Sequence, residues 1–453
     1  WWDFRNGTNY NVFAQRISAA GTPLWTTGGV SVCSAVGDQY YPLIVPDGSG
    51  GAIVTWWDFR SFVSWDVYAQ RISSAGTPQW TFNGVAVCNA VNHQYYSTIA
   101  ADGSGGAILA WSDNRSGTNF DIYAQRVSAA GTPQWTANGV GLCTAAADQY
   151  YAAIAADGSG GAITAWADSR SGNRDIYAQR VSAEGAVLWT AGGVALCTAA
   201  DDQSNPVIVS DGPSGAVVAW PDYRSGTDYD VYAQRVSADG LPQWTADGVA
   251  LCTAAGDQYD FPGVVGDGSG GAILAWTDYR GGETCDIYAQ RVSVFGKPVW
   301  AADGVALCTA EGDQCHPPLA PDGEGGAIVV WEDGRAGQAD VYAQRVLAGG
   351  ALGGGVVSVP GESPLAFALE PVSPNPWRGG TLAVRFTLPG AAPGSLELLD
   401  LAGRSIAARD IGSLGAGRHT LDLGQGLRLA PGLYLVRLSQ GAHARVTRVA
   451  VLS

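Results

Sequence analysis

The chain has 453 residues, including 63 glycines, 17 tryptophans and 18 tyrosines, no methionine, and a net charge of −16. Nine arginines and six acidic residues follow residue 360, so that this end carries +3 and the rest carries −19. Such an acidic body argues against nucleic acid or anionic lipid as partners. No run of 18 apolar residues is present that would span a membrane.

The pattern Trp-x-Asp-x-Arg recurs about every 55 residues, which indicates a repeat protein. Its copies begin at Trp1, Trp56, Trp111, Trp166, Trp220, Trp276 and Trp331. Within one period, residues 148–200, four short runs alternate apolar and polar residues, and Gly, Asp, Asn and Ser stand at the reversals. Four-stranded sheets of this size bury both faces by stacking radially, which predicts a β-propeller.

The repeats set the predicted domain boundaries. Complete repeats begin at Gln39, Gln94, Gln149, Gln203, Gln258 and Gln314. Residues 1–37 supply only the back half of another repeat, so we predict seven blades with an N-terminally incomplete first blade. The start within a repeat and the lack of methionine suggest N-terminal truncation or processing. We assign residues 1–348 to the propeller, 349–365 to a Gly-rich linker and 366–453 to a small immunoglobulin-like β-sandwich, giving an all-β protein.

The Asp and Arg of the motif, such as Asp168 and Arg170, occur in every copy. A catalytic group is needed once, on one side of a propeller, whereas an ion pair that supports each blade is needed in every blade. We therefore interpret these residues as scaffold.

Two of the eight cysteines break the repeat. Six occupy one repeat position and are predicted to be small buried residues. They are Cys33, Cys88, Cys143, Cys197, Cys252 and Cys308. Cys285 and Cys315 instead lie in loops that emerge on the same face of adjacent blades, so they are candidates for a disulfide.

Two resemblances follow from these motifs. The segment ADGSGGAILAW…DIYAQRVSAAGTPQW is similar in strand order to sialidase-like propellers, and SADGLPQW at 237–244 resembles their Asp-box hairpin. That hairpin is structural in the family, so the resemblance implies a fold. The segments LEPVSPNPWRGGTLAVRFTL and APGLYLVRLSQGAHARVTRVAVL resemble the C-terminal sorting domain of type IX secretion cargo, which is related to the immunoglobulin-like domain of flagellar hook-capping proteins. The matching features are Pro374-Asn-Pro376, Gly403-Arg404 and Pro431-Gly-x-Tyr434.

The sorting resemblance implies contact with a secretion machinery and export, so we expect an extracellular protein or one on the outer cell surface. On the propeller, aromatic residues gather in the loops of one face, where they suit stacking on sugar rings or gripping a partner protein. The predicted ligand-binding residues are Tyr10, Trp65, Phe120 and Tyr229 in one loop position, and Tyr40, Tyr95, Tyr150 and Tyr259 in another. An alternative for the second set is a role as wedges between blades.

We therefore predict a binding or adhesion module that recognises a glycan or a surface protein, and not an enzyme. No cofactor or metal ligand set is predicted. A sialidase-like glycoside hydrolase is the alternative, for which Glu283, Glu311 and His316 near the two unusual cysteines form the one asymmetric cluster. A purely structural surface or fibre subunit is a further alternative.

Overall fold

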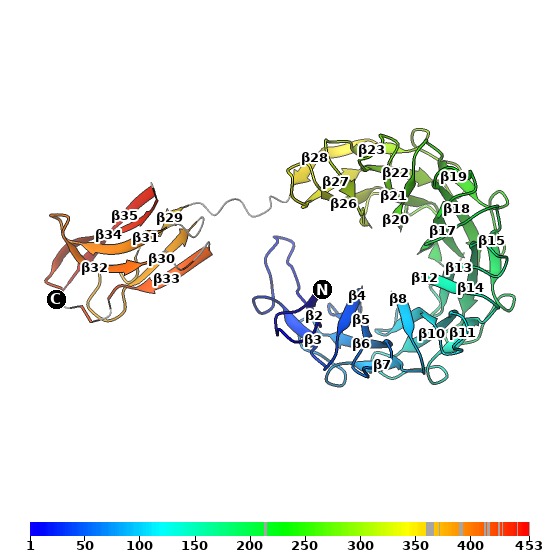
Figure 1. The fold of residues 1–453 in the computed structure, drawn as a ribbon, viewed down its shortest axis with the longest axis horizontal. Coiled ribbons are helices and arrows are strands. Elements are labelled where there is room, and N and C mark those ends of the chain that lie inside the picture. Colours follow the sequence, from blue (N-terminus) through cyan, green and yellow to red (C-terminus); the bar gives the residue numbers. More distant parts are fainter. Residues whose placement is uncertain are drawn as a thin grey trace. The chain divides into compact units, whose positions relative to one another are not determined.

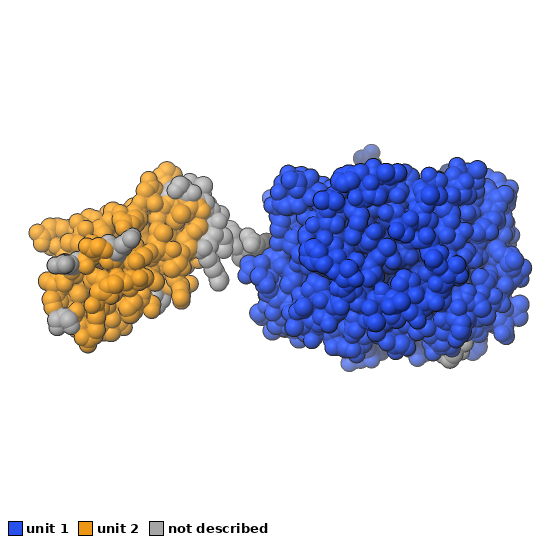
Figure 2. Space-filling model, turned by 90° about the horizontal axis from the view of Figure 1, so that it is seen from below, with its two compact units in different colours: residues 1–359 blue, residues 360–453 orange. Residues whose placement is uncertain are grey.

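The computed structural model describes residues 1–212, 215–358, 367–370, 372–388, 393–411, 414, 417–424, 426–427, 429–441 and 443–452. The chain divides into two compact units, Trp1–Val359 and Pro360–Ser453, which Figure 2 colours separately. The described residues form β-strands joined by turns and contain no α-helix. None of them therefore belongs to a helix that is long and apolar enough to cross a membrane.

Unit 1 consists of seven antiparallel sheets, as the repeat predicts, and we number them in chain order. Sheet 1 has three strands, β1 (Trp2–Asp3), β2 (Asn11–Ala14) and β3 (Val30–Cys33). Sheets 2 to 4 are β4 (Gln39–Pro46), β5 (Ala52–Asp58), β6 (Asp66–Ile72) and β7 (Val85–Cys88); β8 (Gln94–Ala101), β9 (Ala107–Asp113), β10 (Asp121–Val127) and β11 (Val140–Cys143); β12 (Gln149–Ala156), β13 (Ala162–Asp168), β14 (Asp175–Val181) and β15 (Val194–Cys197). Sheets 5 to 7 are β16 (Val207–Ser210), β17 (Gly215–Asp222), β18 (Asp230–Ser237) and β19 (Val249–Cys252); β20 (Gln258–Gly266), β21 (Ala272–Asp278), β22 (Asp286–Val292) and β23 (Val305–Cys308); β24 (Gln314–Cys315), β25 (Leu319–Pro321), β26 (Ala327–Asp333), β27 (Asp340–Val346) and β28 (Leu352–Ser358).

The seven sheets stand side by side in an arc around a common centre (Figure 1). In each complete sheet the chain enters on the innermost strand and moves outward through antiparallel hairpins. This is the blade arrangement of a β-propeller.

The hairpin between the first two strands of a sheet is fixed by its aspartate. In the turn between β4 and β5, one oxygen of Asp47 accepts hydrogen bonds from the amides of Ser49 and Gly51, each at 2.8 Å. The other oxygen accepts a hydrogen bond from Nε of Arg71 at 2.9 Å, and Arg71 lies on β6. The turn is thereby tied to the third strand of its own sheet.

The Trp-x-Asp-x-Arg motif forms a buried ion pair in each complete sheet. In sheet 4, Trp166 and Asp168 are fully buried, and the indole Nε1 donates to the carboxylate at 2.8 Å. Arg170 donates to both oxygens of Asp168 and to the carbonyl of Gly192, and its guanidinium lies 4.1 Å from the centre of the Tyr177 ring. It also contacts the sulfur of Cys143 in the preceding sheet at 3.0 Å. The motif therefore connects strands within one sheet and reaches its neighbour.

Six hydrophobic cores join the seven sheets in the part of the chain that the structure describes. Each core lies between two consecutive sheets; for example, Trp80 and Cys88 of sheet 2 pack with Leu109 and Trp111 of sheet 3. None of these cores joins sheet 7 to sheet 1, and Figure 1 shows that the two sheets stand apart. The arc of sheets is therefore open.

The end faces of the arc expose residues that are buried elsewhere. Ile328 of sheet 7 is 42% exposed, whereas its equivalent in sheet 6, Ile273, is 0% exposed. At the other end, Trp1 is 45% exposed, although the motif tryptophans of the later copies are buried. These two faces are of the same kind as the faces that meet at the six internal boundaries.

Unit 2 is a sandwich of two antiparallel sheets. One contains β29 (Ala368–Leu369), β30 (Ala383–Leu388) and β33 (Gly417–Asp422), and the other contains β31 (Gly394–Leu399), β32 (Ser405–Asp410), β34 (Gly432–Gln440) and β35 (His443–Val451). Trp377, Phe386, Leu398 and Val436 are buried between them.

Strand β28 occupies part of the range 349–365 that the sequence predicts to be a linker. Its residues pair with β27, with Leu352 opposite Val346 and Gly353 opposite Arg345. Backbone hydrogen bonds alone extend the sheet here, because a ladder needs no side chains. Unit 1 thus continues beyond the predicted end at residue 348, to Val359.

Candidate functional site

The eight predicted ligand-binding aromatics lie at the boundaries between sheets, where they contact one another. Tyr10 packs on Tyr40 and Phe120 on Tyr150, with ring centres 5.0 Å apart in each pair. The corresponding distance between Tyr229 and Tyr259 is 6.0 Å. Tyr259 is 39% exposed, and the other seven are partly buried.

Trp65 is held differently from its equivalents. Its ring lies 4.8 Å from Phe59 and 5.5 Å from Tyr40, and its backbone amide donates to Nδ1 of His93. Tyr95 is partnered by Phe120, at 5.9 Å, and stacks on His93. The predicted residues therefore form three groups of packed rings, and all of them except Tyr259 are partly buried.

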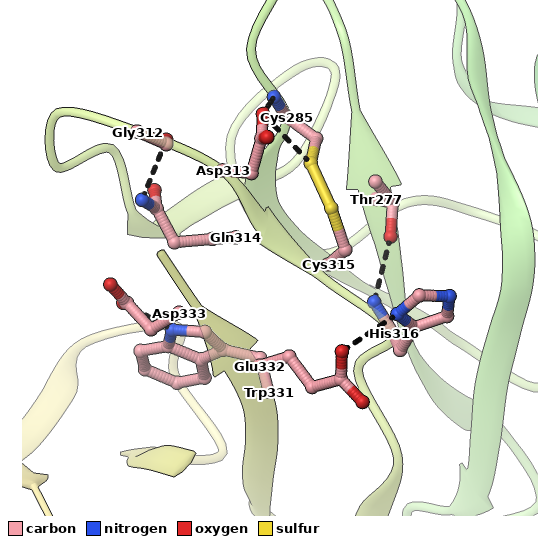
Figure 3. The surroundings of a disulfide bond; sticks show 10 residues. All are labelled: Thr277, Cys285, Gly312, Asp313, Gln314, Cys315, His316, Trp331, Glu332 and Asp333. Atoms are coloured by element: carbon pink, nitrogen blue, oxygen red, sulfur yellow. Dashed lines mark hydrogen bonds and ion pairs between the residues drawn. A yellow bond between two sulfur atoms is a disulfide. The ribbon is translucent and has the colours of Figure 1, made fainter. Parts of the chain in front are cut away.

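A disulfide joins Cys285 to Cys315 at the boundary between sheets 6 and 7 (Figure 3). The two cysteines are 30 residues apart and hold the same repeat positions as Phe120 and Tyr150. A covalent bond thus stands where an aromatic pair stands at other boundaries. The six repeat cysteines are buried free thiols, and burial raises the pKa of Cys88 to about 12.

The innermost strand contains a β-bulge directly after these rings. In sheet 4, Tyr150 pairs with Ala167 but Ala153 pairs with Ala165, so that Tyr151 and Ala152 lie in the irregularity. Tyr151 has a φ of 56°, in the left-handed region that non-glycine residues rarely adopt. Bulges re-aim side chains, and unusual backbone conformations gather at functional sites.

The same conformation recurs at equivalent positions of the other inner strands. Tyr41, Tyr96, Asn205 and His316 have φ values of 51°, 52°, 44° and 56°. Sheets 2 to 4 thus place a tyrosine at this bulge, sheet 5 an asparagine and sheet 7 a histidine. The bulge is a repeated structural device whose side chain differs between the two halves of the arc.

The bulge tyrosines line a pocket of about 790 Å³. Its aromatic wall is continuous, because ring centres are 5.3 Å apart for Trp2 and Tyr41, 4.5 Å for Tyr41 and Trp57, 5.3 Å for Trp57 and Tyr96, and 4.8 Å for Tyr96 and Tyr151. The remaining lining residues are Pro42, Leu43, Ser97, Thr98, Ala152, Asn205, Pro206 and Val207.

The aromatic wall presents free surface to this pocket. Trp2, Tyr41 and Tyr96 are 43%, 53% and 39% exposed. A tyrosine phenol is protonated at neutral pH, and burial raises the pKa of Tyr96 further, so its hydroxyl can donate a hydrogen bond. Exposed rings at a concave site with a few polar groups are typical of ligand pockets.

Sequence reasoning selected the first tyrosine of each Tyr-Tyr pair and missed the second. It also missed Trp2 and Trp57, which stand at the variable position of Trp-x-Asp-x-Arg. A usable signal existed, because tryptophan occupies that position only in the first two copies and so breaks the repeat. The direction of the second tyrosine depends on the bulge, which no local pattern reveals.

Sheet 7 carries a polar pair at the positions that hold an aromatic pair in sheet 2. His316 replaces Tyr41 and Glu332 replaces Trp57, and His316 Nδ1 lies 3.5 Å from a carboxylate oxygen of Glu332 (Figure 3). The backbone amide of His316 donates to the hydroxyl of Thr277 in sheet 6 at 3.2 Å. Both side chains of the pair are more than half exposed, so solvent and ligands can reach them.

No family model and no curated protein matches this sequence. Among solved structures it is similar to a puromycin hydrolase, with 12% identity, a TM-score of 0.46 and coverage of 83% of this chain and 56% of that chain. It is also similar to a polysaccharide lyase described as an ulvan lyase (12% identity, TM-score 0.44, 74% and 87% covered). A third is an α-L-arabinanase from Penicillium chrysogenum complexed with arabinobiose (12% identity, TM-score 0.38, 68% and 93% covered).

These similarities concern the fold. The chain spans little more than half of the puromycin hydrolase. Glycan-cleaving enzymes recur among the similar structures, and this finding contradicts the prediction that the chain is not an enzyme. Unit 1 is a β-propeller by its own sheet topology.

Proposed function

We propose that this protein is a carbohydrate-active propeller that holds a glycan in the pocket of sheets 1 to 5. The observation that supports this most directly is the continuous wall of five rings, Trp2, Tyr41, Trp57, Tyr96 and Tyr151. Sugar rings have apolar faces that stack on aromatic side chains, and their hydroxyls hydrogen-bond to neutral polar groups. Ser97, Thr98 and Asn205 supply such groups at the edge of the wall.

We further propose that the chain cleaves the bound glycan by hydrolysis, with Glu332 and His316 as candidate acid–base residues. Hydrolysis adds one water across the glycosidic bond: a general acid protonates the leaving oxygen while a base accepts the proton of water. Because the two groups lie 3.5 Å apart, they would act together as one acid or base, whereas the two roles of a glycosidase are filled by groups about 5 Å or more apart. The observation that supports these two residues is their place in the repeat, which is that of two rings that line the pocket, Tyr41 and Trp57.

Binding is tested with a panel of oligosaccharides and calorimetry. Trp57→Ala is expected to weaken the tightest-binding oligosaccharide by about 2 kcal/mol, the scale of an aromatic hot spot. Phe82→Ala is the matched control, since Phe82 is 80% exposed and lies outside the pocket lining. Equal affinity of both variants and the wild type would place binding elsewhere.

Hydrolysis is tested by the release of reducing ends from the same panel. Glu332→Gln is expected to abolish turnover and to retain binding, because the amide preserves shape and removes the proton-transfer group. Turnover that persists in Glu332→Gln would contradict the assignment of this residue. If the wild type binds a glycan but releases no reducing ends, the proposed hydrolysis is wrong and the protein is a glycan-binding module.

For unit 2 we propose a sorting role that delivers the protein to the outer cell surface. The proposal is supported by the sandwich fold and by the Pro374-Asn-Pro376, Gly403-Arg404 and Pro431-Gly-x-Tyr434 features. Fusion of residues 360–453 to a reporter in a bacterium with type IX secretion should bring the reporter to the surface. Retention of the reporter, with a known cargo exported normally, would refute this role.

A further inference from the structure

The pocket lining contains no charged residue. Its thirteen residues are five aromatic rings, three neutral polar residues and five aliphatic residues or prolines. Recognition of a carboxylate or sulfate on a sugar relies on Arg or Lys, which provide charge and forked hydrogen bonds. The described walls of this pocket offer neither.

The cations of unit 1 are already engaged in its scaffold. Residues 1–359 contain 15 arginines and one lysine, and 14 of these arginines are the two repeat arginines of each copy. Thirteen of the 14 form an ion pair with an aspartate. The remaining repeat arginine, Arg16, donates to the backbone carbonyl of Ser74. Moving such an arginine toward a ligand would leave a buried aspartate without its partner, which is costly.

Two cations lie outside this set, Arg174 and Lys297. Lys297 lies in the turn after β22, where its backbone carbonyl accepts a hydrogen bond from the amide of Ser293. Arg174 precedes β14 and its backbone amide is bound to Asp202. Neither residue lines the pocket. The acidic balance of unit 1 adds a general repulsion toward anions.

Two residues of the pocket lining carry buried polar atoms with unused hydrogen-bonding capacity. Ser97 is 5% exposed and its Oγ has no hydrogen-bond partner among the residues that the structure describes. The buried Oδ1 of Asn205 is in the same situation. Ten other buried side-chain atoms also lack a partner among the described residues, and what distinguishes these two is that their residues line the pocket, where a ligand can complete them.

We infer that the pocket is selective for neutral, hydroxyl-rich glycans, and that Ser97 and Asn205 are specificity-determining residues which hydrogen-bond to sugar hydroxyls. This inference rests on the proposed glycan-binding function and narrows it to a substrate class. Uronic acids and sulfated sugars are disfavoured at this site. Chain cleavage by elimination needs a proton made acidic by an adjacent carboxyl or ester group, so a neutral glycan without uronic acid residues leaves hydrolysis as the available reaction.

The test uses the full chain and calorimetry to compare a charged glycan with a neutral ester that differs from it by the charge and a methyl group on each sugar. Oligogalacturonate and its methyl ester share one backbone, and the neutral cello-, xylo-, arabino- and chito-hexaoses complete the panel. We expect the methyl ester to bind at least tenfold more tightly than the free acid, and the tightest hexaose to be neutral. Tighter binding of the free acid or of a sulfated oligosaccharide, with loss of that binding in Trp57→Ala, would overturn the inference and leave the proposed function intact.

Variants at the pocket provide a second readout. Ser97→Ala is expected to weaken the tightest neutral hexaose by up to about tenfold, the range of a single hydrogen bond, with no change in melting temperature. Thr98→Lys should raise the affinity for oligogalacturonate, whereas Ser104→Lys adds the same charge in the hairpin between β8 and β9, outside the pocket lining. An equal effect of the two lysines would indicate attraction by the whole surface and overturn the assignment of selectivity to the pocket. If no glycan of any charge binds, the proposed function itself fails.

Discussion

Trp166 is the first residue of its copy of Trp-x-Asp-x-Arg, and Trp57 is the second residue of its copy. The two side chains lie in different environments. Trp166 is fully buried in the core between sheets 3 and 4, with its indole bound to Asp168. Trp57 is partly exposed on the wall of the pocket. The side of the strand on which each ring lies decides this, since successive side chains point to opposite faces.

Substitution by alanine should therefore separate stability from binding. Trp166→Ala is expected to lower the free energy of unfolding by about 3–5 kcal/mol, because it leaves a cavity and removes a hydrogen bond. Trp57→Ala should lower it by about 1 kcal/mol or less and should act on ligand affinity instead. Urea denaturation measures both, and a similar loss in the two variants would contradict this division.

The sequence predicts the structural role of the buried tryptophans, but it does not predict which residues line the pocket. The buried tryptophans recur with the period, and their number alone indicates a structural role. Tyr41, Tyr96 and Tyr151 also recur, yet their orientation depends on a bulge with positive φ that forms only when the strand pairs with its neighbour. Ser97 is an ordinary serine in the sequence, and its unsatisfied hydroxyl is visible only in three dimensions.

At the scale of the element, the third strand of five complete sheets begins with an aspartate whose pKa is raised, and four of these five aspartates are buried. The residues are Asp66, Asp121, Asp175, Asp230 and Asp286. Burial is the main cause in each, and it raises the pKa of Asp66 and of Asp230 to about 6 from an ordinary value of 3.8. The folded chain thus keeps protons near pH 5 that the unfolded chain releases.

Stability should consequently fall as pH rises from 5 to 7. A raised pKa contributes stability that is complete below the unfolded value and is lost as pH passes through the folded value. The ion-paired Asp47 and Asp333 have lowered pKa values, so their contribution changes only below about pH 4. Urea unfolding at pH 5 and pH 7 should show the fall, and Asp230→Asn should reduce it. Asp239→Asn, at an exposed turn, is the control; an unchanged fall in Asp230→Asn would contradict the assignment.

The strands and hairpins themselves were predictable, because alternation and turn residues are local signals. The last strand of sheet 7, β28, could not be predicted in this way. In its sequence three consecutive glycines separate Leu352 from Val356. Its formation depends on the unpaired edge of β27, which is a property of the sheet.

At the scale of the whole molecule, the repeat predicts the number of sheets and leaves open whether they close into a ring. Closure depends on the angle between neighbouring sheets, which is set by packing at six boundaries. The result is an open arc whose end faces carry Ile328 and Val341 on one side and Trp1 and Ile17 on the other, all more than 40% exposed.

The open arc predicts unequal effects of the same substitution at equivalent positions. Ile273→Asp places a carboxylate in the core between sheets 6 and 7 and should lower the free energy of unfolding by several kcal/mol. Ile328→Asp, one repeat later, should change it by about 0.5 kcal/mol or less, and should reduce self-association seen by sedimentation. A large destabilisation by Ile328→Asp would mean that the end face is covered in solution.

Sheet 1 has three strands and one neighbour, yet it contributes Trp2 to the pocket. Sheets that share fewer cores with their neighbours open more often, so the amide hydrogens of β1 to β3 should exchange faster than those of sheets 2 to 6, which share a core on both sides. A glycan that spans Trp2 and Tyr41 would link sheet 1 to sheet 2 and slow that exchange. Ligand binding would then stabilise sheet 1 against local unfolding. Hydrogen exchange with and without the tightest-binding oligosaccharide would measure this stabilisation.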